Sequence, residues 1–347
     1  MPSNAEISEL LCLASEEAGR SDQQRRALRR AGRAAWLWPI EASELLAKGR
    51  SLTELRLVGP WIASILASWI AVPPPIPEPP PIRRRFLTRT EVDGILRESQ
   101  NAMPIRGDLQ VHTLDSDGTE SIAAMAFAAQ RRGLRYLAIT DHSRGLAIAN
   151  GMNEMQLASQ GEEIRLLNDA ASHDGFRILR AVEMNLSPSG EGDLDPDFLA
   201  TLDVVLGAFH SRLRVREDQT ERYLAALRNP SIHVLAHPRG RIFNHRLGLC
   251  ADWRKVFDCA REYDRAVEID GYPDRQDLDV DLLEIARETG VRISLGSDAH
   301  ASRQLDFLDF SVAAARRSGI AADRIVNCME PDELLAWTSG LRAKSRM

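Results

Sequence analysis

Residues 106–143, RGDLQVHTLDSDGTESIAAMAFAAQRRGLRYLAITDHS, contain the pattern that decides the fold. A short apolar run over Gly107–His112 is typical of a buried strand, and the amphipathic stretch Ser121–Arg132 is typical of a helix. Gly133 follows as a C-terminal helix cap and leads directly into a second strand over Tyr136–Thr140. The order of strand, helix and strand predicts a parallel β-α-β unit.

The same alternation of Val-, Ile- and Leu-rich runs with amphipathic stretches continues to residue 300. A later example is the helix Asp281–Thr289, which Gly290 ends before the next strand. We expect seven strands, over Gly107–His112, Tyr136–Thr140, Arg177–Glu183, Val204–Phe209, His233–Ala236, Ala266–Ile269 and Arg292–Leu295. Strands that alternate with helices in this way predict a closed parallel α/β barrel, one unit short of the common eight.

Polar residues of the kinds that bind metals follow nearly every predicted strand. In chain order they are Gln110 and His112 with Asp117 in the loop beyond, Asp141 with His142, Glu183, His210, His237, Glu268 with Asp270, and Asp298 with His300. Because the C-terminal strand ends of a barrel face one mouth, we expect these side chains to converge on one site.

The donor types of this set indicate which ions it would hold. Five of the eight histidines fall at strand ends, together with carboxylates and without thiolates. Imidazole and carboxylate ligands suit Zn²⁺, Mn²⁺ or Fe²⁺ and exclude a structural zinc finger. For the other histidines, His173, His233 and His245, we expect ordinary structural roles.

Six segments resemble the successive motifs of the PHP (polymerase and histidinol phosphatase) superfamily. They are DLQVHTLDSDG, ITDHS, the glutamate of AVEMN, GAFHS, AHPRGR and GSDAH, and they span residues 107–300 in the family's order. The resemblance implies a distorted (β/α)7 barrel of PHP/TIM-like type and a metal-dependent phosphoesterase. It also implies two or three divalent transition-metal ions, Zn, Mn or Fe, at the mouth.

The resemblance further implies how the ligands are shared. One ion would be surrounded by Gln110, His112, Glu183 and Asp298, a second by Glu183, His210 and His237, and a third by Asp117, His142 and His300. Glu183 would bridge the first two ions, and Glu183, Asp298 and His300 would be the catalytic residues. Asp270 is expected to orient a ligand rather than to bind metal.

Position 110 departs from the family's commonest pattern, which opens with His-x-His where this chain has Gln110-Val111-His112. An amide oxygen is a weaker ligand than imidazole for these ions, so occupancy of the first site is in question. Some PHP domains of bacterial family X DNA polymerases look similar here, so glutamine need not mean an inactive enzyme.

A metal centre of this kind implies a mechanism in which cations a few Å apart bind the phosphoryl group. They lower the pKa of a bound water to about 7, and the resulting hydroxide attacks phosphorus. Arg144, beside ITDHS, and Arg239, beside AHP, are candidates to bind phosphate oxygens of the substrate. For both, a salt bridge at the rim is the alternative.

The chain before residue 107 has a different character. We expect helices over Glu6–Ala18, Asp22–Leu37, Ile40–Ala47 and Gly59–Ile70. The stretch AVPPPIPEPPPIRRR at 71–85 then favours a stiff polyproline II spacer of ~3.1 Å per residue. These features predict a small all-α domain at 1–70, a Pro-rich linker and connecting segment at 71–106, and the hydrolase barrel at 107–347.

The segment from ALRRAGRAAWLWP to ILASWI resembles the N-terminal domain of bacterial family X polymerases, and its second part resembles half of a helix-hairpin-helix unit. Such a hairpin offers backbone N–H groups to a DNA phosphate. The usual hairpin has two glycines, as in GVGP, whereas this chain has Leu57-Val58-Gly59-Pro60, a change that restricts close approach of the backbone. The candidate DNA-contacting residues are Gly59, Arg29, Arg30 and Arg33; a purely structural helical domain is the alternative.

The distribution of charge differs between the first part of the chain and the remainder. The net charge is −6, but residues 1–106 carry 15 Lys and Arg against 12 Asp and Glu, whereas the remainder carries 29 against 38. A basic first part on an acidic body fits a nucleic-acid-contacting appendage, and a solvated helix face is the alternative. The lack of a signal-peptide pattern, of a membrane-length apolar stretch and of CxxC pairs predicts a cytoplasmic protein without a membrane partner.

Three functions remain open. The leading one is hydrolysis of phosphate esters at nucleic-acid ends, as a 3′–5′ exonuclease or an end phosphatase. A polymerase palm cannot fit between the linker and Asp108, so the chain resembles a family X polymerase that has kept only a DNA-contacting domain and a PHP hydrolase. The second is a small-molecule phosphatase, such as a histidinol-phosphate phosphatase. The third is a DNA-binding scaffold with an inactive PHP fold, against which the nearly complete ligand set argues.

Overall fold

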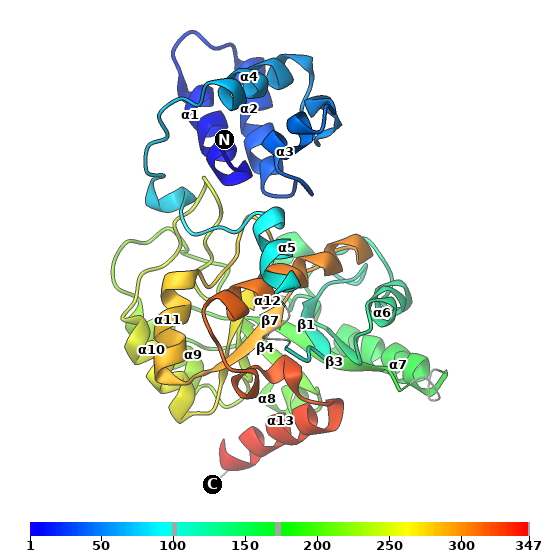
Figure 1. Cartoon of the computed structure of the whole chain (residues 1–347). Coiled ribbons are helices and arrows are strands. Elements are labelled where there is room, and N and C mark those ends of the chain that lie inside the picture. Colours follow the sequence, from blue (N-terminus) through cyan, green and yellow to red (C-terminus); the bar gives the residue numbers. More distant parts are fainter. Residues whose placement is uncertain (99–102, 171–174, 346–347) are drawn as a thin grey trace. The chain divides into compact units, whose positions relative to one another are not determined.

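The computed structural model describes residues 1–98, 103–170 and 175–345 and divides the chain into two compact units, Met1–Ser99 and Gln100–Met347 (Figure 1). The first unit contains α-helices and short 3-10 turns. They are α1 (Asn4–Glu16), α2 (Asp22–Ala35), α3 (Ala42–Ala47), η1 (Leu52–Glu54), α4 (Pro60–Ala71), η2 (Pro81–Arg83) and α5 (Arg89–Arg97). The predicted small all-α region is therefore present.

Local capping begins several of these helices. Ser3, Ser21 and Thr88 each accept a hydrogen bond from a backbone N–H of the first turn, and a Glu or Gln side chain at N3 completes the capping box. The helices enclose one apolar cluster that includes Leu11, Leu28 and Trp38. The exposed arginines of α2, Arg26, Arg29, Arg30 and Arg33, lie on the face opposite its buried Leu28 and Ala31.

The hairpin before α4 keeps a left-handed residue although it lacks the expected first glycine. Leu57 stands where the resemblance expects that glycine, and it adopts φ 63° with a side chain that is 42% exposed. This conformation costs a residue with a Cβ about 1–2 kcal/mol. Gly59 follows as the N-cap of α4, with no atom within 4 Å of the position that a Cβ would occupy.

The Pro-rich stretch is fixed to the first unit by a buried ion pair. Arg83 Nε and Nη2 each donate to a different carboxylate oxygen of Glu9 at 2.7 Å, and both side chains are almost completely buried. Removal of either partner would leave a buried charge uncompensated, which typically costs about 3–5 kcal/mol. The compact units divide at Ser99, while the bounds 1–70, 71–106 and 107–347 remain predictions for the domains.

The second unit is a parallel barrel of seven strands in sequential order. The strands are β1 (Gly107–Val111), β2 (Tyr136–Ile139), β3 (Arg177–Asn185), β4 (Val204–Ala208), β5 (Val234–Leu235), β6 (Ala266–Asp270) and β7 (Arg292–Gly296). Each neighbouring pair is parallel, from Gly107 opposite Tyr136 in the first pair to Asp270 opposite Gly296 in the last. This confirms the predicted (β/α)7 fold.

The barrel is nearly closed between β1 and β7. A single parallel bridge joins Val111 to Ala299, and the backbone N–H of His112 donates to the Ala299 carbonyl at 2.8 Å. Lower in the seam, the buried side chain of Asn327 donates to the carbonyls of Gly107 and Leu295 and accepts from the Leu295 N–H. One amide thus replaces part of the ladder between these two strands.

Helices follow the strands around the barrel (Figure 1). They are α6 (Ile122–Arg131), α7 (Glu154–Ala170), α8 (Pro196–Leu199), α9 (Thr220–Arg228), α10 (Trp253–Glu262), α11 (Val280–Thr289), α12 (Leu308–Arg317) and α13 (Pro331–Ser345), with short turns η4 (Ala147–Ala149), η5 (Ser302–Phe307), η6 (Ala322–Arg324) and η7 (Val326–Cys328). Gly133 and Gly290 end α6 and α11 in the left-handed conformation, as the sequence indicated.

Side chains on the inner face alternate along each strand and change character toward the C-terminal end. Leu179 and Ala181 of β3 belong to a buried apolar cluster, and Glu183 lies two residues further along the same face. The cluster continues to Val326 and Leu334 of the C-terminal segment, which fill the N-terminal end of the barrel. The polar C-terminal end is consequently the open one.

Two features of the structure bear on the expected cytoplasmic location. Within the described residues, no helix is long and apolar enough to cross a membrane. The four cysteines are not joined by disulfides. The cytoplasmic location stays a prediction.

Candidate metal centre

Glu183 lies at the centre of the polar side chains at the barrel mouth. Its side chain is fully buried. Oε1 lies 2.7 Å from His237 Nε2 and 3.0 Å from His210 Nε2. Oε2 lies 3.3 Å from His142 Nδ1, 3.4 Å from His112 Nε2 and 3.2 Å from the amide nitrogen of Gln110. One carboxylate at the end of β3 therefore connects groups from four other strand ends.

Asp117 forms a second focus, with three imidazoles. Its Oδ1 lies 3.3 Å from His300 Nε2, 3.6 Å from His142 Nε2 and 4.0 Å from His112 Nδ1. The rings of His142 and His300 each stack on that of His112 with centroids 4.4 Å apart. Three stacked imidazoles at this separation cannot all be protonated without strong repulsion. Neutral rings have nitrogen lone pairs, and these can bind a cation.

The loop that carries Asp117 is held by Asp141, a buried carboxylate at the end of the second strand, where the sequence placed it beside His142. Asp141 accepts from the N–H and hydroxyl of Thr113, from the hydroxyl of Ser116 and from the side chain of Gln160 at 2.5–2.8 Å. Gly118 lets the loop approach β1, since a Cβ there would lie 2.7 Å from backbone atoms of His112 and Thr113. These contacts fix where Asp117 points.

Asp298 completes the buried end of the site. Its Oδ1 lies 3.1 Å from His112 Nε2, and its backbone carbonyl contacts His300 Nδ1 at 2.7 Å. The residue adopts φ 53°, an uncommon conformation that turns the side chain into the mouth. Asp298, His112 and Glu183 thereby face one another within the barrel.

The electrostatics of the site reflect this crowding. Burial opposes the charged form of His237, but the Glu183 carboxylate outweighs it and raises the pKa to about 9. Burial likewise opposes the charged form of His300, whose pKa is raised to about 9 by Asp117 and Asp298. Burial lowers the pKa of His142 to about 4. Although burial disfavours a charged Glu183, the imidazoles of His142, His237 and His210 hold its pKa well below the usual value.

The residues present fit a metal centre. Three groups offer ligand atoms within 4.8 Å of one another: His112, Asp117, His142 and His300; His142, Glu183 and His210; and His112, Glu183 and Asp298. Among the described residues, buried atoms without a hydrogen-bond partner include His112 Nδ1, His142 Nδ1 and Asp298 Oδ2. Such atoms are costly when buried unless a cation or water satisfies them.

The amide of Gln110 would have to turn to serve as a ligand. Its nitrogen faces Glu183, while its oxygen has no hydrogen-bond partner in the described part of the chain. A side chain at Gly296 would collide with both the Gln110 side chain and the unpartnered Oε1 of Glu268. If the amide turned, its nitrogen could donate to the nearby Glu268 carboxylate and its oxygen could bind the cation.

Known proteins resemble this chain over about two thirds of its length. No family model matches. A probable phosphatase from Aliivibrio fischeri is 31% identical over 231 residues, which make up 63% of this chain and 88% of the relative.

This chain belongs to the PHP superfamily of phosphoesterases.

Other similar proteins differ in how much of their length they share with this PHP chain. The DNA polymerase/3′-5′ exonuclease PolX of Bacillus subtilis is 38% identical over 234 residues, 67% of this chain, but the match spans only 41% of PolX. A solved histidinol phosphate phosphatase from Lactococcus lactis, complexed with zinc, L-histidinol and phosphate, aligns with 62% of this chain and 95% of its own at 17% identity and a TM-score of 0.47.

All nine predicted metal ligands lie at the mouth of the PHP barrel, whereas the two candidate phosphate-binding arginines have other partners. Arg144 is exposed, donates to the Asp193 carbonyl at 2.8 Å and pairs with Glu154 at 3.3 Å. The guanidinium of Arg239 contacts Asp279 and donates to the Leu247 carbonyl. Phosphate binding by these two residues stays a prediction.

The remaining histidines lie apart from the PHP site where they are described. His233 is buried within the fold and its Nδ1 accepts the Val205 N–H at 2.9 Å. His245 Nε2 contacts Arg214 at 2.8 Å. His173 lies outside the described residues. The carboxylate of Asp270 accepts the Tyr272 N–H at 2.6 Å and lies 3.7 Å from Arg275.

Arg275 is a residue of the PHP site that sequence reasoning missed. Its Nη1 lies 2.5 Å from Asp298 Oδ2. The only signal in the sequence was its position in the loop after the sixth strand, within the charged run DGYPDRQDLD. No spacing rule distinguishes it there from its neighbours.

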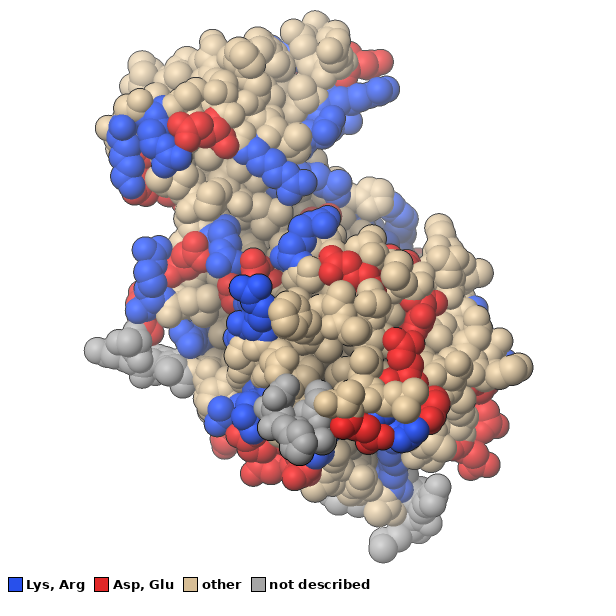
Figure 2. Space-filling view, turned by 90° about the vertical axis from the view of Figure 1, so that its right-hand side faces the viewer, with Lys and Arg blue, Asp and Glu red and all other residues tan. Residues whose placement is uncertain are grey.

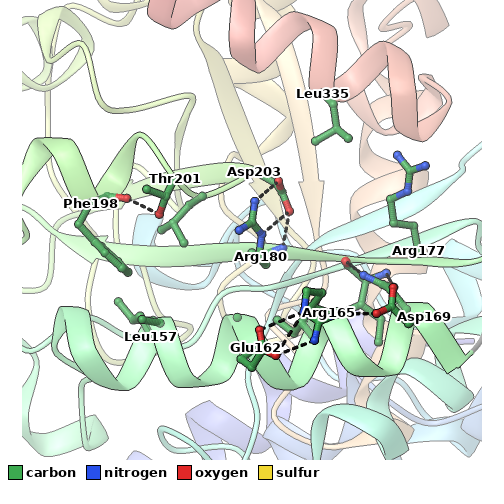
Figure 3. Close-up of a pocket in the computed structure, with 16 residues that line it drawn as sticks. Leu157, Glu162, Arg165, Asp169, Arg177, Arg180, Phe198, Thr201, Asp203 and Leu335 are labelled. Atoms are coloured by element: carbon green, nitrogen blue, oxygen red, sulfur yellow. Dashed lines mark hydrogen bonds and ion pairs between the residues drawn. The ribbon is translucent and has the colours of Figure 1, made fainter.

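A surface groove of about 520 Å³ lies apart from the PHP site, between α7, β3, α8 and α13 (Figure 3). Its charged side chains pair with one another, Arg165 with Glu162 and Asp169 and Arg180 with Asp203. None of the predicted site residues lines it. The groove therefore contributes nothing to the metal centre.

Substitution of Glu183 should remove bound metal while leaving the fold intact. We expect Glu183→Gln and Glu183→Ala to lose affinity for Mn²⁺ or Zn²⁺ by more than the ~10–100-fold that supporting residues of metal sites typically contribute. Elemental analysis after dialysis, with circular dichroism as the check on folding, measures this. His245→Ala, which alters a histidine outside the site, should retain the metal. Equal metal content in all variants would contradict the central role of Glu183.

Metal affinity should rise with pH. In the metal-free protein, His237 and His300 have pKa values of about 9 and carry protons at pH 7. A ligating imidazole must be neutral, so binding releases these protons. We expect the apparent affinity to increase from pH 7 to 9 and then to level off, with proton release measured by calorimetry in buffers of different ionisation enthalpy.

The stability of the metal-free protein should change in the opposite sense. The folded-state pKa of His237 lies above its ordinary 6.5, so its ion pair stabilises fully below about 6.5 and is lost as the pH rises through about 9. A metal affinity that is independent of pH would mean that these imidazoles are not ligands.

Proposed function

We propose that this phosphoesterase hydrolyses phosphate esters at the ends of nucleic acids, as a 3′–5′ exonuclease or an end phosphatase. The observation that carries the proposal is the buried Glu183 carboxylate, which contacts four imidazoles and an amide at the open end of the barrel. Such a set is suited to two or three ions of Zn, Mn or Fe. When bound, divalent ions supply Lewis acidity to the phosphoryl group and acidify a water molecule.

The chain's own residues hold this chemistry in position. Glu183, His112 and Asp298 are fully or almost fully buried, so their charges and lone pairs act in a medium that screens little. Asp117, His300 and His210 are partly exposed, with side chains at 33%, 21% and 16%. The partly exposed edge is where we expect the phosphate ester to approach.

Features of the first unit support a nucleic-acid substrate over a small metabolite. Arg26, Arg29, Arg30 and Arg33 are exposed along α2, and we call them the basic face of α2. The hairpin at Gly59 leads into the N-terminus of α4, where backbone N–H groups favour an anion. The similarity to PolX, named for a 3′-5′ exonuclease, supports the same assignment.

The surface charge suggests that DNA contacts are local. On the face in Figure 2, basic and acidic side chains lie in small groups of both signs between larger areas of other residues. The chain as a whole has a net charge of −6. Binding would therefore depend on a few arginines rather than on a broad basic surface.

The proposal is tested with the full-length protein on three substrates in the presence of Mn²⁺ or Zn²⁺: a 3′-tailed oligonucleotide, the same oligonucleotide with a 3′-phosphate, and histidinol phosphate. We expect kcat/KM for at least one oligonucleotide to exceed that for histidinol phosphate by at least about 100-fold, and chelation to abolish the activity. A preference for histidinol phosphate would favour the small-molecule phosphatase. No turnover of any ester by the metal-loaded protein would favour the inactive scaffold.

Neutralising the basic face of α2 should weaken DNA binding and leave the chemistry unchanged. For Arg29→Ala/Arg30→Ala/Arg33→Ala, we expect a higher oligonucleotide KM and a salt dependence of binding whose slope falls by up to about 2–3, because each neutralised phosphate releases a counterion. Hydrolysis of a small chromogenic ester should not change.

The matched control is a triple variant of exposed arginines in the second unit, Arg165→Ala/Arg254→Ala/Arg261→Ala. It removes the same charge from a region to which we assign no DNA contact. Equal effects of the two triple variants on oligonucleotide KM would mean that the first unit has no special part in DNA binding.

A further inference from the structure

Arg275 reaches the metal centre from a firmly held loop. It follows β6, its backbone N–H donates to the Tyr272 carbonyl at 2.8 Å, and its own carbonyl accepts from Arg241 Nε at 2.9 Å. The side chain is 32% exposed, and its Nη1 lies 2.5 Å from Asp298 Oδ2 and 3.7 Å from Asp270 Oδ2. The backbone at Arg275 is therefore held in place, while its partly exposed side chain reaches the site.

The contact between Arg275 and Asp298 is ionic without being a directed hydrogen bond. Despite the short separation, Asp298 Oδ2 has no hydrogen-bond partner among the described residues. The donors of the Arg275 guanidinium make no hydrogen bond to a described side chain or carbonyl. A guanidinium that serves only to hold a carboxylate would instead align two parallel N–H donors with it.

The charges around Arg275 explain why it lies there. Glu183, Glu268, Asp270 and Asp298 are all buried in this part of the barrel. A cation nearby stabilises the charged form of such closely spaced buried carboxylates. A divalent ion between Asp298, His112 and Glu183 would supply that charge and would repel the guanidinium at the same time.

We propose that Arg275 is a phosphate-binding residue of the active site. In the metal-free protein its guanidinium compensates the charge of Asp298; when divalent ions are bound, it moves off Asp298 and donates to a phosphoryl oxygen of the substrate. The inference rests on the proposed function only in that the substrate carries a phosphoryl group.

Two further observations agree with this role. The Arg275 guanidinium carbon lies 5.5 Å from the centre of the Tyr272 ring, and that ring meets the His300 ring edge-on at 6.4 Å. Arg275 therefore lies on the same side of the mouth as the partly exposed His300. Arg144 and Arg239, by contrast, already donate to carbonyls and contact carboxylates that are not among the predicted ligands.

The experiment measures two affinities whose expected changes have opposite signs. Mn²⁺ is titrated into metal-free full-length protein, and inorganic phosphate is then titrated into the Mn²⁺-loaded protein, both by calorimetry. For Arg275→Ala we expect Mn²⁺ to bind at least as tightly as in the unmodified protein, because a competing cation is gone, and phosphate to bind at least about tenfold more weakly. Arg275→Lys should give an intermediate phosphate affinity, since it keeps the charge without the fork of donors.

The control is Arg254→Ala, which removes an exposed arginine paired with Glu288 and should change neither affinity. Weaker Mn²⁺ binding in Arg275→Ala would overturn the proposal, because it would make Arg275 a residue that positions Asp298. Unchanged phosphate affinity would overturn it as well. If Arg275→Ala does not fold, the same two comparisons are made with Arg275→Lys and Arg275→Gln.

These titrations separate the inference from the proposed function. A protein that binds Mn²⁺ and phosphate through Arg275 but cleaves no oligonucleotide would contradict the nucleic-acid substrate alone. A protein that cleaves oligonucleotides with Arg275→Ala unaltered in phosphate affinity would contradict the role of Arg275 alone.

Discussion

The carboxylate of Glu183 is fully buried and has an imidazole nitrogen 2.7 Å from one oxygen and others 3.3 and 3.4 Å from the second. A charge in such a place is tolerated only where its partners are fixed, because an uncompensated buried carboxylate would cost several kcal/mol. The strands and loops at the mouth hold these partners in place. The strands bring the partners together, the loops orient them, and the remaining lone pairs leave room for cations.

The barrel meets the constraint through alternation along its strands. On the inner face of β3, Leu179 and Ala181 pack into the apolar interior and Glu183 follows at the next inward position. The same face can therefore be a packed core at one end and a metal centre at the other. The seam between β1 and β7 is the weakest part of the ring, and Asn327 joins it with three hydrogen bonds from one buried amide.

Charge compensation also links the site to its mechanism. Without metal, protons on His237 and His300 and the guanidinium of Arg275 are the positive charges that face the carboxylates. In the proposed mechanism, metal binding would replace them, release protons and free the guanidinium for the substrate. The same groups that compensate the carboxylates without metal would thus become ligands or phosphate contacts when metal is bound.

The sequence alone determined the barrel, the order of its strands and the types of residue at their ends, because strand alternation and glycine caps are local properties. Gly133 and Gly290 marked helix ends correctly, and residues such as His112 and Glu183 fell at strand ends that must share one mouth. The sequence also indicated an unusual hairpin in which Leu57 replaces the expected glycine. Only the structure showed that this leucine adopts the left-handed conformation.

Tertiary structure decided the contacts that depend on loops. The network of Asp141 around the Asp117 loop, the place of Glu268 beside Gln110 and the approach of Arg275 to Asp298 all join residues far apart in the chain. It also showed that the guanidinium of Arg239 contacts Asp279, a partner that the sequence did not indicate. Loop conformations and long side chains are set by contacts of long sequence separation, which no local pattern encodes, whereas the periodicity of a strand is encoded in the strand itself.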